Sequence, residues 1–410
     1  MINRRSWFKK SAAAIASVPL VNATFAATPS APLDSTKVLG TPPKEVGTRS
    51  GFEKLERLVY AREASSASAT PLELLNGIIT PSDLHFERHH GGIPTIDPDR
   101  YALLIHGLVD RPLKFSLTEL KRFPAESRIC FIECSGNGGR AVLGRGAPVA
   151  EEVTAGQVDG LFSTSEWTGV RLSTLFDAVG VKRKAKWFLA EGQDSAVMSR
   201  TIPVEKGFDD AMIVYAQNGE PLRPGQGYPV RLLLPGWEGN AQIKWLRRID
   251  VSDTPFFSRE ETSKYTDAKT DGRIEMFSFV MAPKSIITSP TFPTVLPGKG
   301  WNEIRGLAWT GHGKIAKVEV STDGGNRWRH AALQAPVLSK GTVRFRIPWQ
   351  WDGKPALFMS RATDELGNVQ LMPGVFADNR GPATFYHNSA IRAWKVDASG
   401  RVTFGQNELA

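Results

Sequence analysis

Hydrophobic and polar positions divide the chain into two regions with different periodicities. From about residue 70 to 255, apolar runs such as KAKWFLAEG and YPVRLLLP alternate with short amphipathic helices, which is typical of a mixed α+β domain. From about residue 275, short strands of alternating polarity such as IAKVEVST and TVRFRIPW follow one another between turn residues. The second pattern predicts an immunoglobulin-like β-sandwich that lacks the usual cysteine pair. We therefore predict an α+β fold with domains at 70–270 and 271–380, followed by a polar tail at 381–410.

Capping residues place several elements inside the first domain. The segment TPLELLNG predicts a helix over 70–77, with Thr70 as N-cap. The segment FSLTELKRFP predicts a second helix, capped by Ser116 and ended by a proline. A loop that bears Trp167 is expected to precede a third helix over 173–180.

The first 27 residues have the features of an export signal. Arg4 and Arg5 begin a basic stretch, and a mildly apolar, alanine-rich run ends in small residues near Ala27. The paired arginines predict twin-arginine export of a folded protein to the periplasm, and the run is too short and too weakly hydrophobic for a membrane anchor. An uncleaved amphipathic segment is the alternative. Residues 28–69 predict a leader on the protein surface, with a helical stretch over 51–63.

Charge and motif content exclude several classes of function. The formal net charge is +9, and it falls to +5 when the four cations of residues 1–27 are removed with the signal. That modest excess can attract small anions or an acidic partner. Because no basic run is interleaved with aromatic residues, we expect no nucleic-acid binding. The chain also lacks a P-loop, a G-x-S-x-G elbow, an H-E-x-x-H helix and a C-x-x-C-H haem motif.

The segment RICFIECSGNGGRAVLGRG carries the clearest chemical signal. Its apolar half predicts a buried strand and its glycine-rich half a tight turn, with Cys134 at the junction. Arg140 and Arg145 follow closely and would favour the thiolate form, which binds metals; a simply buried cysteine is the alternative. Cys130 and Cys134 would lie about 13 Å apart in one extended strand, too far for a disulfide. A single thiolate suits a cofactor that brings its other ligands.

An unpatterned segment before the first domain strand is rich in histidine and arginine. It contains His85, Arg88, His89 and His90, and such segments are more often functional than structural, although a solvated loop is the alternative. His89 and His90 would point apart in an extended chain, so they are poor joint ligands for one metal ion.

Several motifs taken together resemble the sulfite oxidase family of molybdenum enzymes over about residues 70 to 380. They are HFERHHGGIP, ECSGNGGR, SEWTGVRL and GYPVRLLLPGWEGN followed by IKWLRR, with the C-terminal sandwich after them. Within that family, HFERHHGG, LPGWEGN, REETSKYTD and YHNSAIRAWKV resemble the branch that oxidises sulfane sulfur in the periplasmic, thiosulfate-oxidising Sox system.

The resemblance implies a molybdenum–molybdopterin cofactor in the 70–270 domain. Cys134 would be the thiolate ligand of molybdenum, and Arg88 and Trp167 would lie beside the substrate. A pterin phosphate requires cationic partners, which agrees with the basic residues of these motifs. The expected cofactor-binding residues are Phe86, Arg88, His89, His90, Cys134, Asp194, Gln226, Arg231, Gln242 and Lys244.

The sequence departs from the family pattern at the expected substrate side. Animal sulfite oxidases carry two arginines where this chain has Gly138–Gly139, which displaces Arg140, and a pterin-contacting histidine aligns with Gln226. The family's active-site tyrosine aligns near Arg259, whereas Tyr265 lies farther along the chain. Fewer charges and more glycine predict an open site, which suits sulfur presented on a protein-borne cysteine.

The resemblance also implies the reaction and its partners. Sulfane sulfur on a carrier protein would be oxidised by oxygen-atom transfer, and a separate c-type cytochrome would accept the electrons because this chain has no haem motif. The 271–380 domain would form a homodimer, giving a heterotetramer with the cytochrome. A stand-alone periplasmic sulfite dehydrogenase with the same cofactor is the alternative, and a methionine sulfoxide reductase is a more distant one. A cofactor-free thiol carrier and an adhesion module are alternatives of other classes, and neither would contain molybdenum.

Overall fold

The computed structural model describes residue 37 and residues 39–142, 148–381 and 385–409. The expected export signal and Arg145 lie outside the described residues. Residues 55–410 form one compact unit, and the following paragraphs describe this unit alone. The helix expected over 51–63 is not present, because the chain there has a turn at 51–52 and then strand β1 (Leu58–Val59). β1 pairs with β2 (Ala67–Ala69), and β2 pairs with β3 (Glu87–Arg88).

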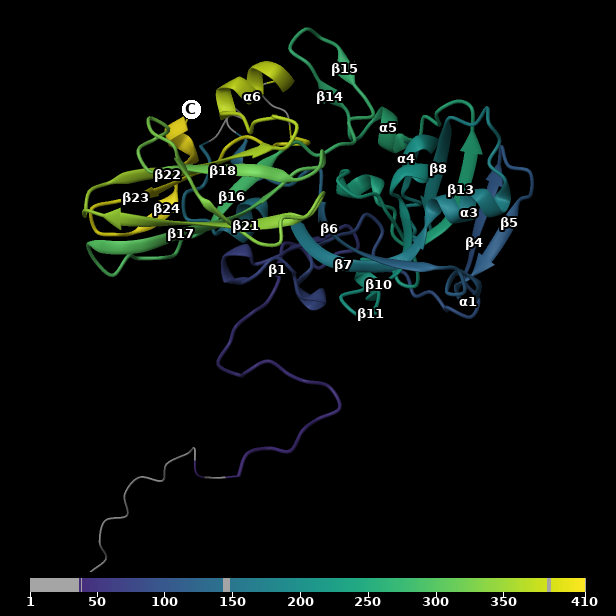
Figure 1. The fold of residues 1–410 in the computed structure, drawn as a ribbon, viewed down its shortest axis with the longest axis horizontal. Helices are drawn as coiled ribbons and strands as arrows, with labels where there is room; N and C mark the ends of the chain where they lie inside the picture. The colour runs from purple at the N-terminus through teal and green to yellow at the C-terminus, as the bar shows by residue number, and fades with distance from the viewer. Residues whose placement is uncertain (1–36, 38, 143–147, 382–384, 410) are drawn as a thin grey trace, which may run out of the picture. The chain divides into compact units, whose positions relative to one another are not determined.

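Two five-stranded sheets form the α+β part of the unit, which Figure 1 shows largely in teal. One sheet has the order β11-β10-β7-β6 with β12 also paired to β10, and the other has the order β5-β4-β13-β8-β9. The pair β4–β13 is parallel and the other pairs are antiparallel. The strands of the first sheet are β6 (Ala125–Glu133), β7 (Phe162–Arg171), β10 (Met212–Gln217), β11 (Glu220–Pro221) and β12 (Arg231–Leu233). The strands of the second are β4 (Ala102–Gly107), β5 (Leu113–Ser116), β8 (Trp187–Gly192), β9 (Ser199–Pro203) and β13 (Leu246–Ser252).

Short helices connect these strands. The predicted capping box begins α1, because the Ser116 hydroxyl accepts from the Glu119 amide and the Glu119 carboxylate accepts from the Ser116 amide. Helix α3 buries residues at helical spacing and ends at Gly180, whose φ of 68° favours glycine. The helices of the unit are α1 (Leu117–Leu120), α2 (Ala155–Asp159), α3 (Leu172–Val179), α4 (Val204–Asp209), α5 (Arg259–Thr262) and α6 (Pro373–Arg380).

Two local predictions were wrong because tertiary contacts outweigh local preference. The helix expected over 70–77 is only a 3₁₀ turn, η2 (Leu72–Leu74). The buried Thr70 hydroxyl donates to the Leu84 carbonyl at 3.0 Å, and the Glu73 carboxylate accepts from the Gly156 amide of α2 at 2.8 Å, so neither side chain caps a helix over 70–77. Trp167 lies in strand β7 and not in a loop, since β7 continues between β6 and β10.

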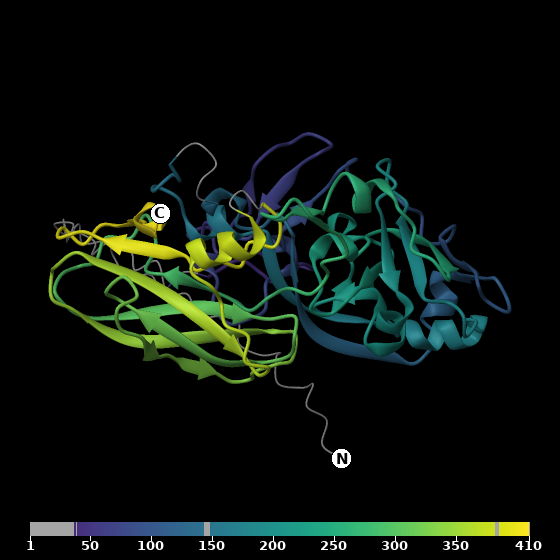
Figure 2. The ribbon, with the colours of Figure 1, turned by 90° about the horizontal axis from the view of Figure 1, so that it is seen from above.

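Residues after 280 form the predicted sandwich of two antiparallel sheets, shown in green to yellow in Figure 2. The first sheet contains β16 (Lys284–Ser289), β17 (Gly300–Trp309), β20 (Ala332–Gln334) and β21 (Thr342–Trp351). The second contains β18 (Ile315–Ser321), β19 (Arg329–His330), β22 (Ala356–Asp364), β23 (Ala393–Val396) and β24 (Val402–Phe404). The segment expected as a polar tail thus contributes β23 and β24 to the sandwich. A small hairpin, β14 (Asp267–Ala268) and β15 (Ile274–Glu275), precedes it.

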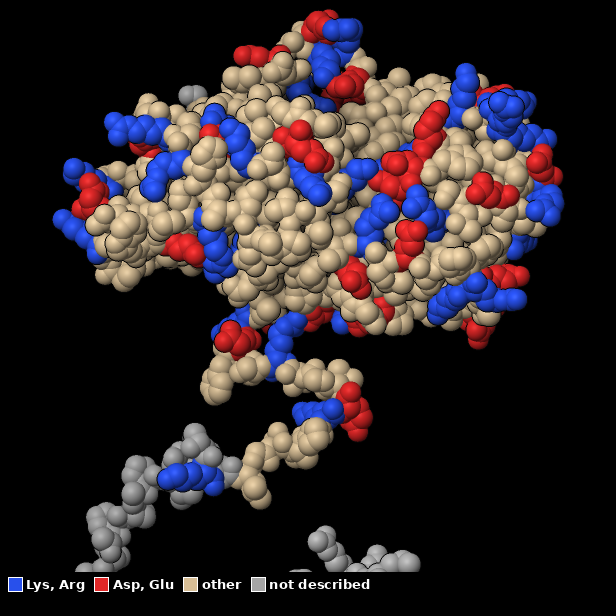
Figure 3. Space-filling view, in the orientation of Figure 1, with Lys and Arg blue, Asp and Glu red and all other residues tan. Residues whose placement is uncertain are grey.

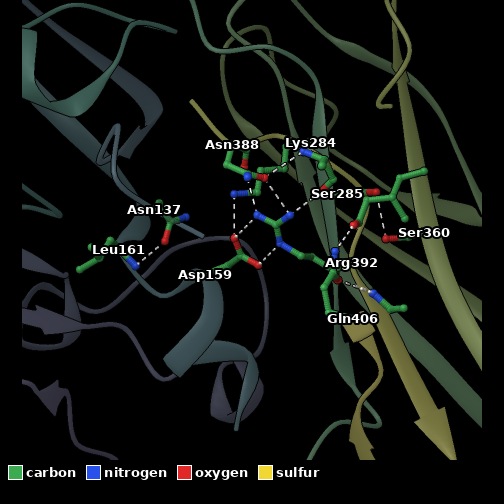
Figure 4. A network of polar contacts seen from close by, with 12 residues as sticks. Asn137, Asp159, Leu161, Lys284, Ser285, Ser360, Asn388, Arg392 and Gln406 are labelled. Atoms are coloured by element: carbon green, nitrogen blue, oxygen red, sulfur yellow. Dashed lines mark hydrogen bonds and ion pairs between the residues drawn. The ribbon is translucent and has the colours of Figure 1, made fainter. Parts of the chain in front are cut away.

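A buried ionic cluster joins the sandwich to the α+β part (Figure 4). The Lys284 ammonium lies 2.9 Å from a carboxylate oxygen of Glu133 and 2.7 Å from one of Asp159, and all three side chains are at most 2% exposed. Arg392 reaches Asp159 at 3.2 Å, and the Trp309 indole donates to Glu133 at 2.6 Å. Although burial alone raises the pKa of Asp159, attraction to Arg392 and Lys284 outweighs it and holds that pKa below its usual value. Each buried charge therefore has an opposite charge beside it.

The surface of the unit carries both signs of charge. On the face shown in Figure 3, basic and acidic side chains are interspersed over the sandwich and the α+β part. Among the helices of the described residues, none has the length and apolar character needed to cross a membrane.

We expect Lys284→Met to lower the stability of the protein strongly. The change leaves two buried carboxylates without their shared cation, and breaking such an arrangement costs about 3–5 kcal/mol. The thermal unfolding temperature should fall by several degrees in scanning calorimetry. Lys354→Met is the matched control, because the Lys354 side chain is 81% exposed beside Asp352 and an ion pair in solvent contributes little to stability. An unfolding temperature of Lys284→Met equal to that of the control would contradict a stabilising role for the cluster.

Candidate active site

A cavity in the α+β part brings together the cofactor-binding residues expected from the sequence. Its residues lie around β3, directly after β6 and β8, at the start of β12, and in the turns that precede β13. All ten expected residues line it: Phe86, Arg88, His89, His90, Cys134, Asp194, Gln226, Arg231, Gln242 and Lys244. Segments that are far apart in the sequence therefore converge on one place.

Cys134 lies directly after β6, at the entrance of the glycine-rich turn. Its amide donates to the Leu161 carbonyl at 2.9 Å, and its carbonyl accepts from the Asn137 amide at 2.9 Å, so the backbone on both sides of the thiol is held. Gly138 has a φ of 77°, which allows the sharp turn. Cys130 is fully buried, and both cysteines are free, as the predicted strand geometry requires.

The expected effect of Arg140 on this thiol is wrong. The Arg140 guanidinium lies 4.8 Å from the ring centroid of Tyr60 and is exposed. Burial raises the pKa of the Cys134 thiol, while a backbone hydrogen bond from Gly136 and attraction to Arg88 lower it in part. Protein groups alone therefore favour the neutral thiol, whereas a bound metal ion would favour the thiolate.

Two cations form the inner wall of the cavity. Lys244 donates to the Arg88 carbonyl at 3.2 Å, the Gly225 carbonyl at 3.1 Å and His89 Nδ1 at 2.8 Å. Burial lowers the pKa of Lys244 to about 7, so an anion bound beside it would be needed to keep it fully charged at neutral pH. Arg231 is buried and donates to the Gln226 carbonyl at 3.0 Å.

His89 links this wall to a carboxylate. Because Lys244 donates to Nδ1, the ring proton lies on Nε2, which donates to Glu87 at 3.0 Å. Burial lowers the pKa of His89, so the neutral form is favoured. Arg57 forms an ion pair with the same Glu87 carboxylate. Glu87 and Lys244 thus fix the orientation of the His89 ring, and Arg57 holds Glu87 from outside the cavity.

Three residues lining the cavity carry a buried polar atom without a hydrogen-bond partner among the described residues: His85 Nε2, Arg231 Nε and Asn240 Oδ1. An unpaired buried polar group costs about 1–3 kcal/mol. A ligand rich in hydrogen-bonding groups and bearing a phosphate would pair them, and it would also match the two inner cations. The cavity therefore fits the molybdenum–pterin cofactor implied by the sequence, with Cys134 as the thiolate.

Tyr265 lines the cavity, although the sequence motifs did not assign it a place there. Its hydroxyl lies 3.2 Å from His90 Nε2, and the Arg200 guanidinium lies 5.3 Å from its ring centroid. Burial raises the pKa of Tyr265, so the phenol stays protonated. Arg259, which aligned nearer to the family's tyrosine, is exposed at the surface and ion-paired with Glu260 at 2.6 Å. In the segment REETSKYTD, the aromatic ring of Tyr265 was the sequence feature that could have indicated a residue of the cavity.

Trp167 was expected beside the substrate, but it does not line the cavity. Its ring is fully buried, because β7 is paired on both edges and turns this side chain into the core. The Arg231 guanidinium lies 5.0 Å from its ring centroid, and the His85 ring contacts it edge-on at 5.6 Å. Trp167 thus supports residues of the cavity wall from behind.

The open space expected beside Gly138–Gly139 is filled. An ideal Cβ on Gly139 would lie 2.2 Å from Cε2 of Phe385, and one on Gly138 would lie 2.2 Å from Nη2 of Arg392. The glycines therefore make room for side chains that arrive from the C-terminal part of the chain.

Comparison with known proteins agrees with this geometry. The family model of the oxidoreductase molybdopterin binding domain matches residues 90–260, and that of the Mo-co oxidoreductase dimerisation domain matches residues 276–392. The solved structure of the sulfane dehydrogenase SoxCD from Paracoccus pantotrophus is similar, with a TM-score of 0.86 and 40% identity over 90% of this chain and 96% of that chain.

Curated relatives are more distant and longer. Mitochondrial sulfite oxidase of Rattus norvegicus is 28% identical over 76% of this chain and 61% of the relative. The NADH nitrate reductase of Ulva prolifera is 30% identical over 62% of this chain and 32% of the relative, so the chain spans about a third of that protein's length.

The matches cover both the cavity and the sandwich, in the order that the sequence motifs predicted. They confirm the resemblance and, with it, the kind of cofactor that the cavity fits. The chain belongs to the sulfite oxidase family of molybdenum-cofactor oxidoreductases.

Proposed function

We propose that this protein oxidises sulfane sulfur held on a cysteine of a carrier protein, at a molybdenum–molybdopterin cofactor in the cavity around Cys134. The observation that carries the proposal is the convergence of ten expected residues in one cavity, in a chain 40% identical to the SoxCD structure over 96% of that structure's chain. The product would be the same cysteine bearing more highly oxidised sulfur.

The residues divide by the part of the complex that each would hold. Cys134 would bind molybdenum, and Arg231 and Lys244 would bind the pterin phosphate. Arg88 and Tyr265 would face the substrate, where a cation and a neutral phenol stabilise an anionic terminal sulfur. The remaining expected pterin contacts are Phe86, His89, His90, Asp194, Gln226 and Gln242.

The bound cofactor supplies two-electron oxygen-atom chemistry at sulfur. In each turnover one oxygen atom, which comes from water, is added to the terminal sulfur, and two protons and two electrons are released. Arg88 stabilises the negative charge of the substrate. The buried cations Arg231 and Lys244 stabilise negative charge that develops in the cavity during the reaction. The electrons would pass to a c-type cytochrome.

Assembly and location follow from the same proposal. The sandwich would form a homodimer, which two cytochrome subunits would complete to a heterotetramer, and residues 1–27 would direct the folded protein to the periplasm. The match of residues 276–392 to a dimerisation domain supports the first part. The paired arginines Arg4 and Arg5 support the second.

A stand-alone sulfite dehydrogenase is the second candidate. It is favoured by the 28% identity to mitochondrial sulfite oxidase and by Arg88, which would bind free sulfite equally well. Cytochrome c reduction by the purified, molybdenum-containing protein tests both candidates. Rapid turnover with sulfite alone would favour the second candidate; turnover only with a persulfide-bearing carrier protein and its cytochrome would favour the first.

We expect Cys134→Ser to lose at least about 100-fold in kcat with any sulfur substrate, because a serine hydroxyl is a poor substitute for a thiolate ligand. The visible absorption of the thiolate–metal bond should also disappear. Cys130→Ala is the matched control: Cys130 is buried in the core behind the cavity, and its replacement should leave both kcat and absorption nearly unchanged. Retention of both properties in Cys134→Ser would contradict the assignment of the metal ligand.

We expect Tyr265→Phe to lower kcat/KM by about fivefold, since it removes a hydrogen-bonding group worth about 1 kcal/mol from the substrate side. The molybdenum content should not change, because the ring that lines the cavity remains. Tyr60→Phe is the control, since the Tyr60 hydroxyl donates to the Gln157 carbonyl at 3.2 Å, away from the cavity. Equal kcat/KM values for the two variants would remove Tyr265 from the reaction.

A further inference from the structure

Two aromatic residues of the C-terminal segment lie beside the glycine-rich turn that follows Cys134. We call Phe385 and Tyr386 the aromatic lip. An ideal Cβ on Gly136 would lie 2.8 Å from Phe385 Cε1, and one on Gly139 would lie 2.2 Å from Phe385 Cε2. The Phe385 ring thus packs directly on two glycines of the loop that begins at Cys134.

Tyr386 extends the lip toward the cavity residue Tyr265. The two tyrosine rings lie 5.2 Å apart between centroids, and the Phe385 and Tyr386 rings meet edge-on at 5.4 Å. The lip therefore runs from the glycine turn to the wall of the cavity.

Buried contacts hold the lip in place. The His387 amide donates to the Ser135 carbonyl at 2.8 Å, next to Cys134. His387 Nε2 lies 2.9 Å from a carboxylate oxygen of the buried Glu238. Farther along the segment, Arg392 donates to Asn388 at 3.0 Å and pairs with Asp159. The segment that follows the lip is thus anchored in the folded structure.

The two side chains of the lip are uncharged. The cations near the glycine turn have other partners: Arg140 is stacked on Tyr60, Arg259 is paired with Glu260, and Arg392 beside Gly138 is paired with Asp159. Phe385 itself is 37% exposed, although it is a large hydrophobic residue. An exposed aromatic ring beside the turn that follows Cys134 favours contact with an apolar or peptide group over a hydrated dianion.

We propose that the aromatic lip of Phe385 and Tyr386 is a specificity element, which favours sulfur carried on a peptide over free sulfite. The proposal rests on the proposed function. The ring faces would contact the cysteine methylene and the adjoining backbone of the carrier. Arg88 can pair with either substrate, whereas only a peptide gains apolar contact with the lip, so the lip favours the peptide.

The test compares two substrates in the molybdenum-loaded protein and its Phe385→Ala variant. The substrates are sulfite and a synthetic peptide of about ten residues whose single cysteine bears a persulfide, with cytochrome c as acceptor. We expect Phe385→Ala to lower kcat/KM for the peptide about tenfold and to leave that for sulfite equal or higher. The same peptide with an S-sulfonate on its cysteine should bind to the Phe385→Ala variant about tenfold more weakly than to the unaltered protein, as measured by fluorescence anisotropy.

Controls separate the lip from general damage. Trp301→Ala removes an aromatic ring that is 72% exposed on β17, and it should leave kcat/KM unchanged for both substrates. If Phe385→Ala loses molybdenum or unfolds, Phe385→Leu keeps an apolar side chain, and it should lower kcat/KM for the peptide about threefold with sulfite unchanged. If the folded variant has the same ratio of kcat/KM for the peptide to kcat/KM for sulfite as the unaltered protein, the proposed role of the lip is wrong, while the proposed function stands. Inactivity of the unaltered protein with both substrates overturns the proposed function, and the lip with it.

Discussion

The position of the expected metal ligand depends on one buried ammonium group. Lys284 of the sandwich lies between the carboxylates of Glu133 and Asp159, and Glu133 immediately precedes Cys134. The same Glu133 accepts hydrogen bonds from Trp309 of the sandwich and from Asn137 of the glycine turn. Because a buried charge needs its partner, these contacts with the sandwich stabilise the strand end and the turn that carry the thiol. The sandwich is therefore a structural part of the active site.

Sequence motifs predicted the inner part of the site better than its rim. The pterin-facing residues lie within contiguous motifs, such as HFERHHGG around Arg88, and each motif begins or ends a strand, so short-range patterns sufficed. Trp167 was misplaced because pairing of β7 on both edges decides where its ring points. The filling of the glycine turn by Phe385 was not predictable, since it depends on a contact between segments that are far apart in the sequence. The 70–77 helix was lost to tertiary hydrogen bonds for the same reason.

The cavity has two ends with different electrostatic character. Lys244 and Arg231 give the inner end positive charge, and the Arg57–Glu87–His89 contacts hold that arrangement from behind. On the proposed substrate side, Arg88 and Tyr265 line the cavity, and the aromatic lip lies next to Tyr265 and the glycine turn. Such a division suits a permanently bound anionic cofactor deep in the protein and a substrate that brings its own bulk to the entrance.

The C-terminal segment also sets the order of events during synthesis. The residues that close the glycine turn, from Phe385 to Arg392, leave the ribosome after nearly every strand of both domains, and β23 and β24 leave after them. A nascent chain thus has an incomplete rim around Cys134 until its last strands are made. Closure of this rim is therefore coupled to completion of the sandwich sheet that contains β23 and β24.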